Sequence, residues 1–138
     1  MAEIYRYTHR VTYRDCTVGN HIYYSRYLDL LEAARGEFFR SLSMPLAELQ
    51  DQDTIFPVIE CRVRYKLPAR YDEVLTIEVA VAEAEGVRLT FRHRILNAAK
   101  ALVAQAETFH VCTSLAEKPK RLPALLRENL QPWIANPE

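Results

Sequence analysis

One long stretch of this chain, residues 24–42, repeats its apolar residues with the period of a helix. The repeated positions, at steps of three and four residues, are Tyr27, Leu31, Ala34, Phe38 and Leu42. Segments before and after this stretch alternate between apolar and polar residues, which is typical of half-buried strands. One long helix with a strand before it and four strands after it predicts an α+β fold, in which an antiparallel sheet wraps around the helix.

Five strands are expected, and four of them have a side that the alternation marks as buried. The first covers residues 4–14, and the last covers roughly residues 102–113, where the pattern leaves the buried side open. The residues expected on the buried sides of the first four strands are, in order, Tyr5, Tyr7, His9, Val11 and Tyr13; Cys61, Val63, Tyr65 and Leu67; Leu75, Ile77, Val79 and Val81; and Leu89, Phe91, His93 and Ile95.

Turn-forming residues indicate how these elements connect. The connections expected are a loop at residues 43–54 with a short helical turn after Pro45, hairpin turns at Gly86 and residues 98–100, and a short C-terminal helix after Pro123. No internal repeat, low-complexity segment or linker divides the chain. Residues 1–138 are therefore expected to form a single domain.

The charges of the chain are balanced, with 18 lysines and arginines against 18 aspartates and glutamates. This balance provides no general field that would attract nucleic acid, and no run of five or more basic residues occurs. Nucleic-acid binding is therefore not expected. A chain of 138 residues buries roughly two-thirds of its unfolded surface, which is enough for a core without metals or disulfides.

The cysteines and the N-terminus bear on the cellular compartment. Cys16, Cys61 and Cys112 are widely spaced, form no CxxC pair and are odd in number, which predicts reduced thiols. The N-terminus lacks the apolar region of a signal peptide, and no uncharged apolar run is long enough to cross a bilayer. The expected location is the cytoplasm, without membrane insertion.

An acid and a glycine turn stand directly before the long helix. Asp15 is followed by a turn at Gly19 and Asn20, and the helix is expected to begin near Tyr24. Amides in the first turn of a helix have no partner within it, so the Tyr24 N–H can donate a hydrogen bond to a bound carbonyl oxygen. A carboxylate beside those amides can attack the carbonyl group that they polarise. The segment therefore indicates chemistry at a carbonyl group.

The same segment resembles the active-site region of the hotdog-fold acyl-CoA thioesterases, in the branch related to 4-hydroxybenzoyl-CoA thioesterase. That branch typically has an Asp-x-Asp motif, a short turn with glycine, an aromatic or Asn pair, a later tyrosine, and a helix with Glu and Arg. The matching residues here are Asp15, Gly19, Asn20, Tyr23, Tyr24, Tyr27, Glu32 and Arg35. Thr17 stands where the branch has its second acid, the one generally credited with catalysis.

Further matches extend the resemblance over nearly the whole chain. They are the stretch Val63-x-Tyr65-x-x-Pro68-Ala69-x-x-Asp72, the hairpin at Gly86, and the tail Lys118-Pro119-x-x-Leu122-Pro123. The resemblance implies a hotdog fold, with a five-stranded antiparallel sheet wrapped around one long helix. It implies hydrolysis of an acyl-CoA thioester without a metal or redox cofactor, coenzyme A being part of the substrate. It also implies a homodimer or homotetramer with active sites between subunits.

Three side chains near the turn are candidates for the catalytic chemistry. Asp15 can act as base toward water or attack the thioester directly to give an anhydride, and the alternative is a loop acid that caps its own turn. In an extended segment Asp15 and Thr17 would share a face, so a modest shift would bring Asp15 near the family's acid position. Thr17 can position a water, close the turn or, with a nearby base, act as nucleophile. His21 can orient the turn or transfer a proton.

The helix carries two further candidates. Arg35 matches an Arg that certain thioesterases resembling those of enediyne biosynthesis use where the acid is missing; an ion pair with Glu32 or Asp29 at the surface or at an interface is the alternative. Glu32 matches the structural Glu of the branch, although another hotdog class places a catalytic Glu on this helix. Tyr23 and Tyr27 are expected to pack or to line the acyl pocket.

Other readings of function stay open. The sequence distinguishes poorly between an acyl-CoA thioesterase and a thioesterase that acts on acyl-carrier-protein substrates in a biosynthetic pathway. A non-catalytic acyl-thioester binding protein would keep the pocket and lose the acid, which is consistent with Thr17. A hotdog dehydratase is disfavoured because none of the four histidines is followed by the Pro-Gly turn expected of those enzymes. His93, on the apolar side of a strand, is expected to be a hydrogen-bonded core residue.

Overall fold

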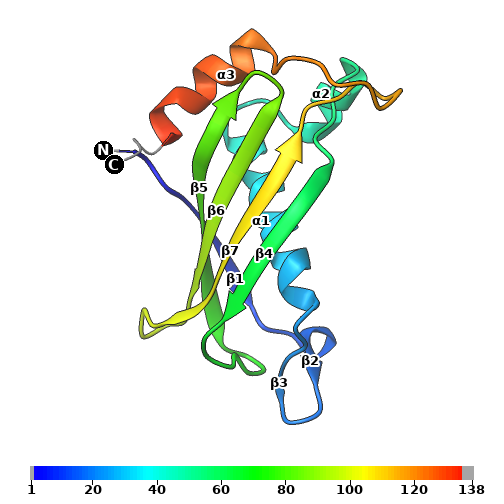
Figure 1. The fold of residues 1–138 in the computed structure, drawn as a ribbon. Helices are drawn as coiled ribbons and strands as arrows, with labels where there is room; N and C mark the ends of the chain where they lie inside the picture. The colour runs from blue at the N-terminus through cyan, green and yellow to red at the C-terminus, as the bar shows by residue number, and fades with distance from the viewer. Residues whose placement is uncertain (1, 135–138) are drawn as a thin grey trace.

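The computed structural model describes residues 2–134 of the chain, and its main feature is a five-stranded antiparallel sheet (Figure 1). The strands lie in the order β1-β5-β6-β7-β4. Their bounds are Tyr5–Arg10 for β1, Val58–Tyr65 for β4, Val74–Glu85 for β5, Arg88–Leu96 for β6 and Leu102–Val111 for β7. A separate two-stranded hairpin consists of β2 (Cys16–Thr17) and β3 (His21–Ile22).

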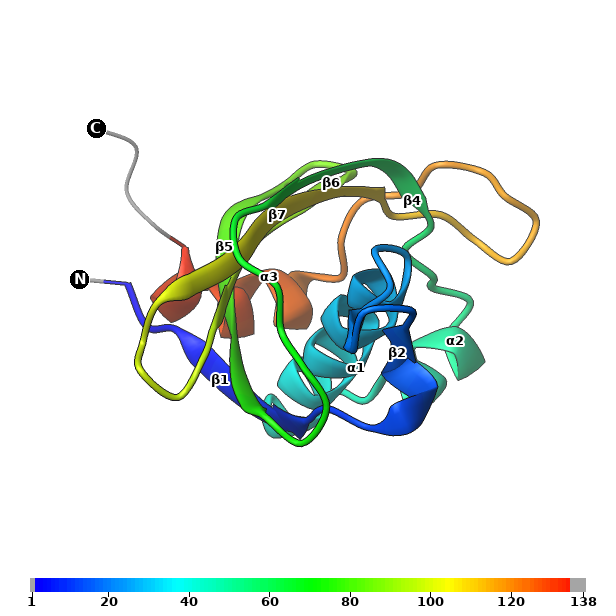
Figure 2. The ribbon, with the colours of Figure 1, turned by 90° about the horizontal axis from the view of Figure 1, so that it is seen from below.

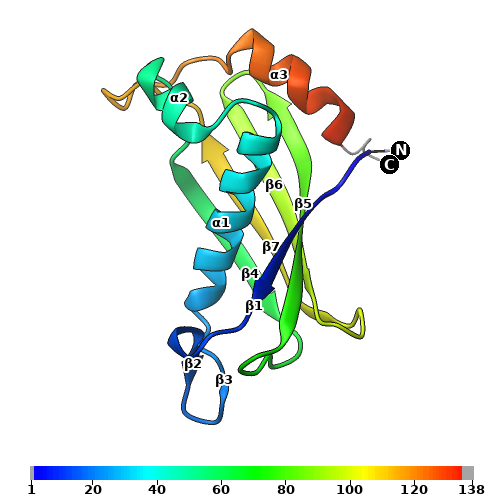
Figure 3. The same ribbon diagram turned by 180° about the vertical axis from the view of Figure 1, so that it is seen from behind.

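Three helices accompany the sheet within residues 2–134. They are α1 (Arg26–Ser41), α2 (Leu46–Asp51) and α3 (Ala124–Leu130), together with two short 3-10 turns, η1 (Tyr13–Asp15) and η2 (Gln131–Trp133). Seen from below, the sheet arches over α1 (Figure 2), and from behind α1 lies across the concave face while α3 lies at one end of the sheet (Figure 3). The expected five-stranded antiparallel sheet wrapped around one long helix is confirmed.

The core lies between α1 and the inner face of the sheet. The predicted buried sides of the third and fourth expected strands are confirmed, because all eight of these residues are buried in β5 and β6. Phe38 of α1 is fully buried at the centre, where its ring lies 5.0 Å from that of Trp133 and 5.6 Å from that of Tyr5. Such aromatic packing contributes more than the buried area alone.

The connections also agree with the sequence pattern. Helix α2 begins directly after Pro45, and Gly86 has a φ of 61° in the turn between β5 and β6. Lys100, in the turn between β6 and β7, has a φ of 64°. Helix α1 begins at Arg26, two residues later than expected, so Tyr24 lies in the turn that leads into the helix. None of the helices within residues 2–134 is long and apolar enough to cross a membrane.

The first strand is shorter than predicted. It ends at Arg10, and the turn η1 follows because the Thr12 backbone N–H donates to the Asp15 side chain and the Asp15 N–H donates to the Thr12 carbonyl oxygen. Such reciprocal bonds favour a helical turn over a continuing strand. The expected placement of Tyr13 on the buried side is wrong, since Tyr13 is 77% exposed and stacks on Tyr71 at the surface.

The second expected strand, β4, has no fully buried side. Cys61, Val63 and Tyr65 lie opposite inner-face residues of β7, as the alternation predicted, but Cys61 and Tyr65 are exposed. The physical reason is the position of α1, which makes its main contacts with β5 and β1 and reaches β4 chiefly through the packing of Tyr27 on Tyr65. Strand β4 is also an edge strand of the described sheet, because within residues 2–134 it pairs with β7 alone. The prediction of a dry face on β4 is therefore wrong for the single chain.

Candidate active site

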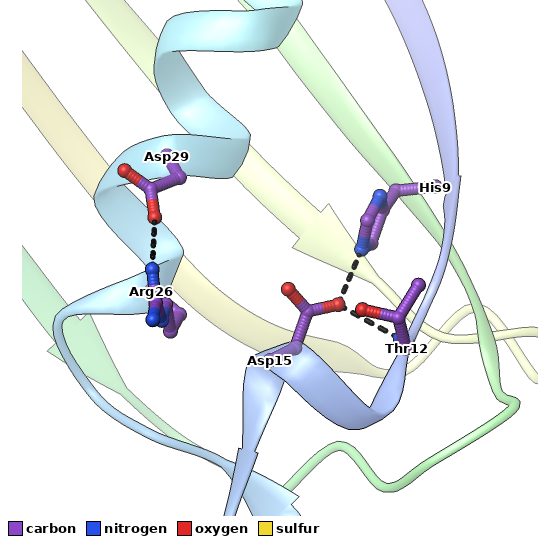
Figure 4. Close-up of polar contacts among 5 residues, drawn as sticks. All are labelled: His9, Thr12, Asp15, Arg26 and Asp29. Carbon is purple, nitrogen blue, oxygen red and sulfur yellow. Dashed lines mark hydrogen bonds and ion pairs between the residues drawn. The ribbon is translucent and has the colours of Figure 1, made fainter.

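Asp15 ends the turn η1, and one of its carboxylate oxygens is held from two sides (Figure 4). Oδ2 accepts a hydrogen bond of 2.8 Å from the Thr12 backbone N–H and another of 2.8 Å from His9 Nε2. Oδ1 makes no hydrogen bond to any residue between 2 and 134, and in Figure 4 it points away from His9 and Thr12. Asp15 therefore caps its own turn, as one of its two expected roles requires, and keeps one oxygen free.

The surroundings of Asp15 favour its ionised form. Its side chain is only 13% exposed, and burial raises the pKa of Asp15, but the hydrogen bonds from the Thr12 amide and from His9 outweigh burial and hold that pKa below its ordinary value. Because an ionised carboxylate only accepts, His9 Nε2 is the donor in their hydrogen bond. A partly buried carboxylate that is ionised at neutral pH can serve as a base or as a nucleophile.

The hairpin β2–β3 carries Thr17 and His21 as directly opposed partners. Gly19 and Asn20 form its turn with φ values of 91° and 58°, a conformation that glycine and asparagine tolerate. His21 Nδ1 lies 3.2 Å from the carbonyl oxygen of Ile22. The structure brings Thr17 and His21 together, but within residues 2–134 neither forms a hydrogen bond with the Asp15 side chain.

The expectation that Asp15 and Thr17 share a face through an extended segment is wrong. Asp15 belongs to η1, and only Cys16 and Thr17 are extended. The carboxylate consequently turns back toward His9 and Thr12 and does not follow the alternation that would align it with Thr17. The two side chains thus occupy different environments, one bonded to β1 and one in the hairpin.

The backbone at Tyr24 is held in place while its amide stays free. The Tyr23 N–H donates to the Asp15 carbonyl oxygen at 2.9 Å, and the hydroxyl of Tyr65 donates to the Tyr24 carbonyl oxygen at 2.9 Å. The Tyr24 N–H itself donates to no backbone or side-chain acceptor in the described part of the chain. An amide that lies just before a helix and lacks a partner is suited to bind a carbonyl oxygen.

The tyrosines around this turn differ in burial. Tyr27 packs in the core, as expected, with its ring 5.2 Å from that of Tyr65, and burial raises the pKa of Tyr27 to about 12. Tyr23 and Tyr24 are exposed and pack on each other with ring centroids 4.8 Å apart. Of the two tyrosines expected to pack, only Tyr27 is a core residue.

Arg35 points into the fold, and this position corrects one of its expected roles. Asp29 pairs with Arg26 at 3.3 Å, and within residues 2–134 neither Asp29 nor Glu32 forms an ion pair with Arg35. Arg35 Nη1 is buried and has no hydrogen-bond partner among the described residues. The guanidinium borders a cavity of about 560 Å³ between α1 and β4, which Glu32 also lines. The expectation that Arg35 forms a surface ion pair with Glu32 or Asp29 is therefore wrong.

Two features of the site are not marked by any sequence motif. His9 pairs with Asp15, although nothing in the local pattern connects a strand residue to an acid six positions later. His93 and His110 share the Thr108 hydroxyl, at 3.3 Å and 3.0 Å from their Nε2 atoms. The expected role of His93 as a hydrogen-bonded core residue is confirmed. In residues 2–134 no group of three or more His, Cys, Asp or Glu side chains is placed to hold a metal ion.

The chain matches a known family and curated relatives over most of its length. Residues 11–134 match the model of the thioesterase-like superfamily. The acyl-CoA thioester hydrolase YbgC of Escherichia coli O6:H1 is 34% identical over 121 residues, which are 87% of this chain and 90% of that protein.

Solved structures with the same fold include a hypothetical protein from Thermus thermophilus, with 27% identity, a TM-score of 0.87, and coverage of 93% of this chain and 98% of that one. They also include a 1,4-dihydroxy-2-naphthoyl-CoA thioesterase from Synechocystis, with 21% identity, a TM-score of 0.86, and coverage of 93% and 96%. At that identity the second likeness shows the fold alone. The chain therefore belongs to the thioesterase-like superfamily and is a thioesterase of hotdog fold.

Proposed function

We propose that this thioesterase hydrolyses an acyl-CoA thioester to the free acid and coenzyme A, with the thioester bound at the start of α1. The observation that carries the proposal is that the Tyr24 amide and Oδ1 of an ionised Asp15 both lack a hydrogen-bond partner within residues 2–134, in a segment where the Tyr23 N–H bonds to the Asp15 carbonyl oxygen. The activity named for the Escherichia coli relative supports the substrate class. Coenzyme A enters as part of the substrate, and we expect no metal or redox cofactor.

The proposed mechanism uses the backbone to stabilise charge and Asp15 to supply the base. The Tyr24 N–H and the N-terminal end of α1 stabilise the negative charge that develops on the carbonyl oxygen. Asp15 takes a proton from an attacking water, the tetrahedral intermediate expels the coenzyme A thiolate, and that thiolate takes up the proton.

Direct attack by Asp15 is the alternative route within the same geometry. The carboxylate would form an anhydride with the acyl group and release the thiolate, and water would then open the anhydride to regenerate Asp15. Thr17 and His21, which face each other across the hairpin, are assigned to positioning the water or the turn in both routes. Both routes require an ionised Asp15, so the lowered pKa of this residue is consistent with either.

We propose that the protein acts as a homo-oligomer built on β4. One edge of this eight-residue strand has no partner strand within residues 2–134, and on its inner face both Tyr65 and the cavity residue Cys61 are exposed. An uncovered edge with an open apolar face is expected to pair with another chain. A second copy on β4 would also close the cavity between α1 and β4, which would exclude water from the acyl group. A cytoplasmic location stays a prediction.

A binding protein without catalytic activity is the second candidate, because Thr17 stands at the family's acid position. An acyl-carrier-protein substrate is the third. The test is release of free thiol from short, long and aromatic acyl-CoAs by the native protein and by Thr17→Asp. Turnover by the native protein supports the proposal. Activity that appears only in Thr17→Asp would indicate a binding protein, and turnover limited to acyl-carrier-protein thioesters would contradict the acyl-CoA assignment.

A further inference from the structure

The cavity between α1 and β4 has an apolar wall and a polar end. Its apolar wall includes Leu28, Leu31, Phe39 and Phe91, and Arg35, Thr108 and His110 also line it. His110 is fixed by two bonds, since Nδ1 lies 3.0 Å from the Phe56 carbonyl oxygen and Nε2 lies 3.0 Å from the Thr108 hydroxyl. Arg35, His93, Thr108 and His110 are called the distal polar cluster below.

Two buried donors or acceptors of this cluster have no partner. Arg35 Nη1 and His93 Nδ1 form no hydrogen bond within residues 2–134, and both atoms are shielded from solvent. Buried polar atoms are normally satisfied, and an unpaired buried guanidinium is especially unfavourable because it carries charge. Arg35 also lines the cavity, and none of its side-chain nitrogens has a hydrogen-bond partner within residues 2–134, so a molecule bound in the cavity lies next to a guanidinium that lacks an acceptor.

The charges of the cluster favour an anionic or strongly polar acceptor. Burial, with a further contribution from Arg35, lowers the pKa of His93 to about 3, and burial likewise lowers the pKa of His110 to about 4. Glu32 lines the same cavity and its negative charge acts on Arg35, although the two form no ion pair within residues 2–134. Both imidazoles are neutral at physiological pH, and the positive charge of the cluster lies on Arg35. An oxygen with negative charge would balance it, and an oxo group would satisfy it more weakly.

We propose that the distal polar cluster binds an oxygen acceptor at the far end of the substrate's acyl group. The preferred substrates are then acyl thioesters that end in a carboxylate or carry an oxo group, in preference to plain fatty acyl thioesters. This inference rests on the proposed function, because it assumes that the thioester lies at the start of α1. It assigns to Arg35 recognition of the acyl group and not stabilisation of the reacting carbonyl.

The position of Arg35 on the helix sets the length of acyl group that fits. Arg35 lies more than two turns beyond the start of α1, about 14 Å along the axis at 1.5 Å per residue. Helical side chains lean toward the N-terminus, so the guanidinium lies closer to the thioester than its Cα does. Leu28 and Leu31, which lie on α1 between its first residue and Arg35, line the cavity and suit a methylene or aromatic segment. An acyl group of medium length with a polar end matches both regions.

The test compares matched acyl-CoAs that differ only at the far end of the chain. Plain, oxo-bearing and carboxylate-terminated chains of the same length are compared by kcat/KM over a range of lengths. Because a hydrogen bond to a charged group contributes about 1.5–3 kcal/mol, the native protein should prefer the carboxylate-terminated chain by roughly tenfold to a hundredfold at the best length. Arg35→Met should remove that preference, whereas Arg40→Met, on the exposed side of α1, should retain it.

Binding of the product acids provides a second readout that does not require turnover. By titration calorimetry, the native protein should bind a dicarboxylic acid more tightly than the monocarboxylic acid of equal length, and Arg35→Met should bind both alike. Should Arg35→Met not fold, Thr108→Val replaces it, with a smaller loss of preference expected because it frees His93 and His110 from their shared hydroxyl.

The outcomes separate this inference from the proposed function. If no acyl-CoA is hydrolysed but the dicarboxylic acid still binds preferentially, the proposed function fails and the distal site stands. If all acyl-CoAs are hydrolysed without regard to the far end, only the distal site fails. A third outcome, in which Arg35→Met lowers every activity alike and reduces the oligomer mass, would make Arg35 an interface residue and overturn the inference.

Discussion

The buried histidines make the stability of this protein sensitive to acid. In an unfolded chain each histidine titrates with a pKa of about 6.5, whereas in the folded protein the pKa of His93 is about 3 and that of His110 about 4. The unfolded state therefore binds more protons at these two histidines below pH 6.5, so their contribution to stability is fully present above that pH and is lost as the pH is lowered toward the folded values.

The size of the effect follows from these shifts. Each histidine costs about 1.4 kcal/mol for every pH unit below its unfolded pKa, so at pH 5 each contributes a loss of about 2 kcal/mol. The pair together should lower the free energy of unfolding by about 4 kcal/mol between pH 7 and pH 5. That loss is large compared with the free energy of unfolding of an ordinary domain, which is roughly 5–15 kcal/mol.

Urea unfolding at the two pH values, followed by the fluorescence of the single tryptophan Trp133, measures this loss. His93→Gln should reduce the difference between the two pH values by about half, and His93→Gln with His110→Gln should remove most of it. His21→Gln, in the partly exposed hairpin, is the matched control and should leave the difference unchanged. A double variant that loses as much stability as the native protein on acidification would refute the reasoning.

Three further predictions concern the site, the interface and the core. His9→Gln should raise the pKa of Asp15, because the substitution removes the imidazole whose hydrogen bond and charge offset the effect of burial. The acid limb of the pH profile of kcat/KM should then move to higher pH, and an unmoved limb would count against Asp15 as the base. Val63→Asp on β4 should shift the mass measured by sedimentation toward the monomer, and an unchanged mass would argue against assembly through this strand. Phe38→Ala should lower the free energy of unfolding by about 3–5 kcal/mol in urea, and a loss below about 1 kcal/mol would contradict its central place in the core.

Local periodicity predicted the elements that are buried against other elements of the same chain. The helical pattern through Phe38 and the alternation through Ile77 and Phe91 correspond to α1, β5 and β6, because the opposing surfaces of these elements belong to the same core. The turn η1 was missed although its signal was local: Thr12 and Asp15 have the spacing of a capping box.

Other features depend on contacts that a linear pattern does not contain. The exposure of Cys61 on β4 follows from where α1 packs, which periodicity does not define. The burial of Arg35 Nη1 and its place in a cavity shared with Thr108 and His110 depend on strands far along the chain. The resemblance to hotdog thioesterases placed Asp15 near the start of α1, but its bond to His9 follows from the turn that brings residue 15 back against β1.

The central claim is that Asp15 supplies the carboxylate for thioester hydrolysis beside the Tyr24 amide. The measurement that tests it most directly is kcat for thiol release from the best acyl-CoA by the native protein and by Asp15→Asn, with the folded state of the variant confirmed by its unfolding curve. The claim predicts a loss of roughly a hundredfold or more in kcat, as is typical when a general base is removed. A folded Asp15→Asn protein that turns over at the native rate would contradict it.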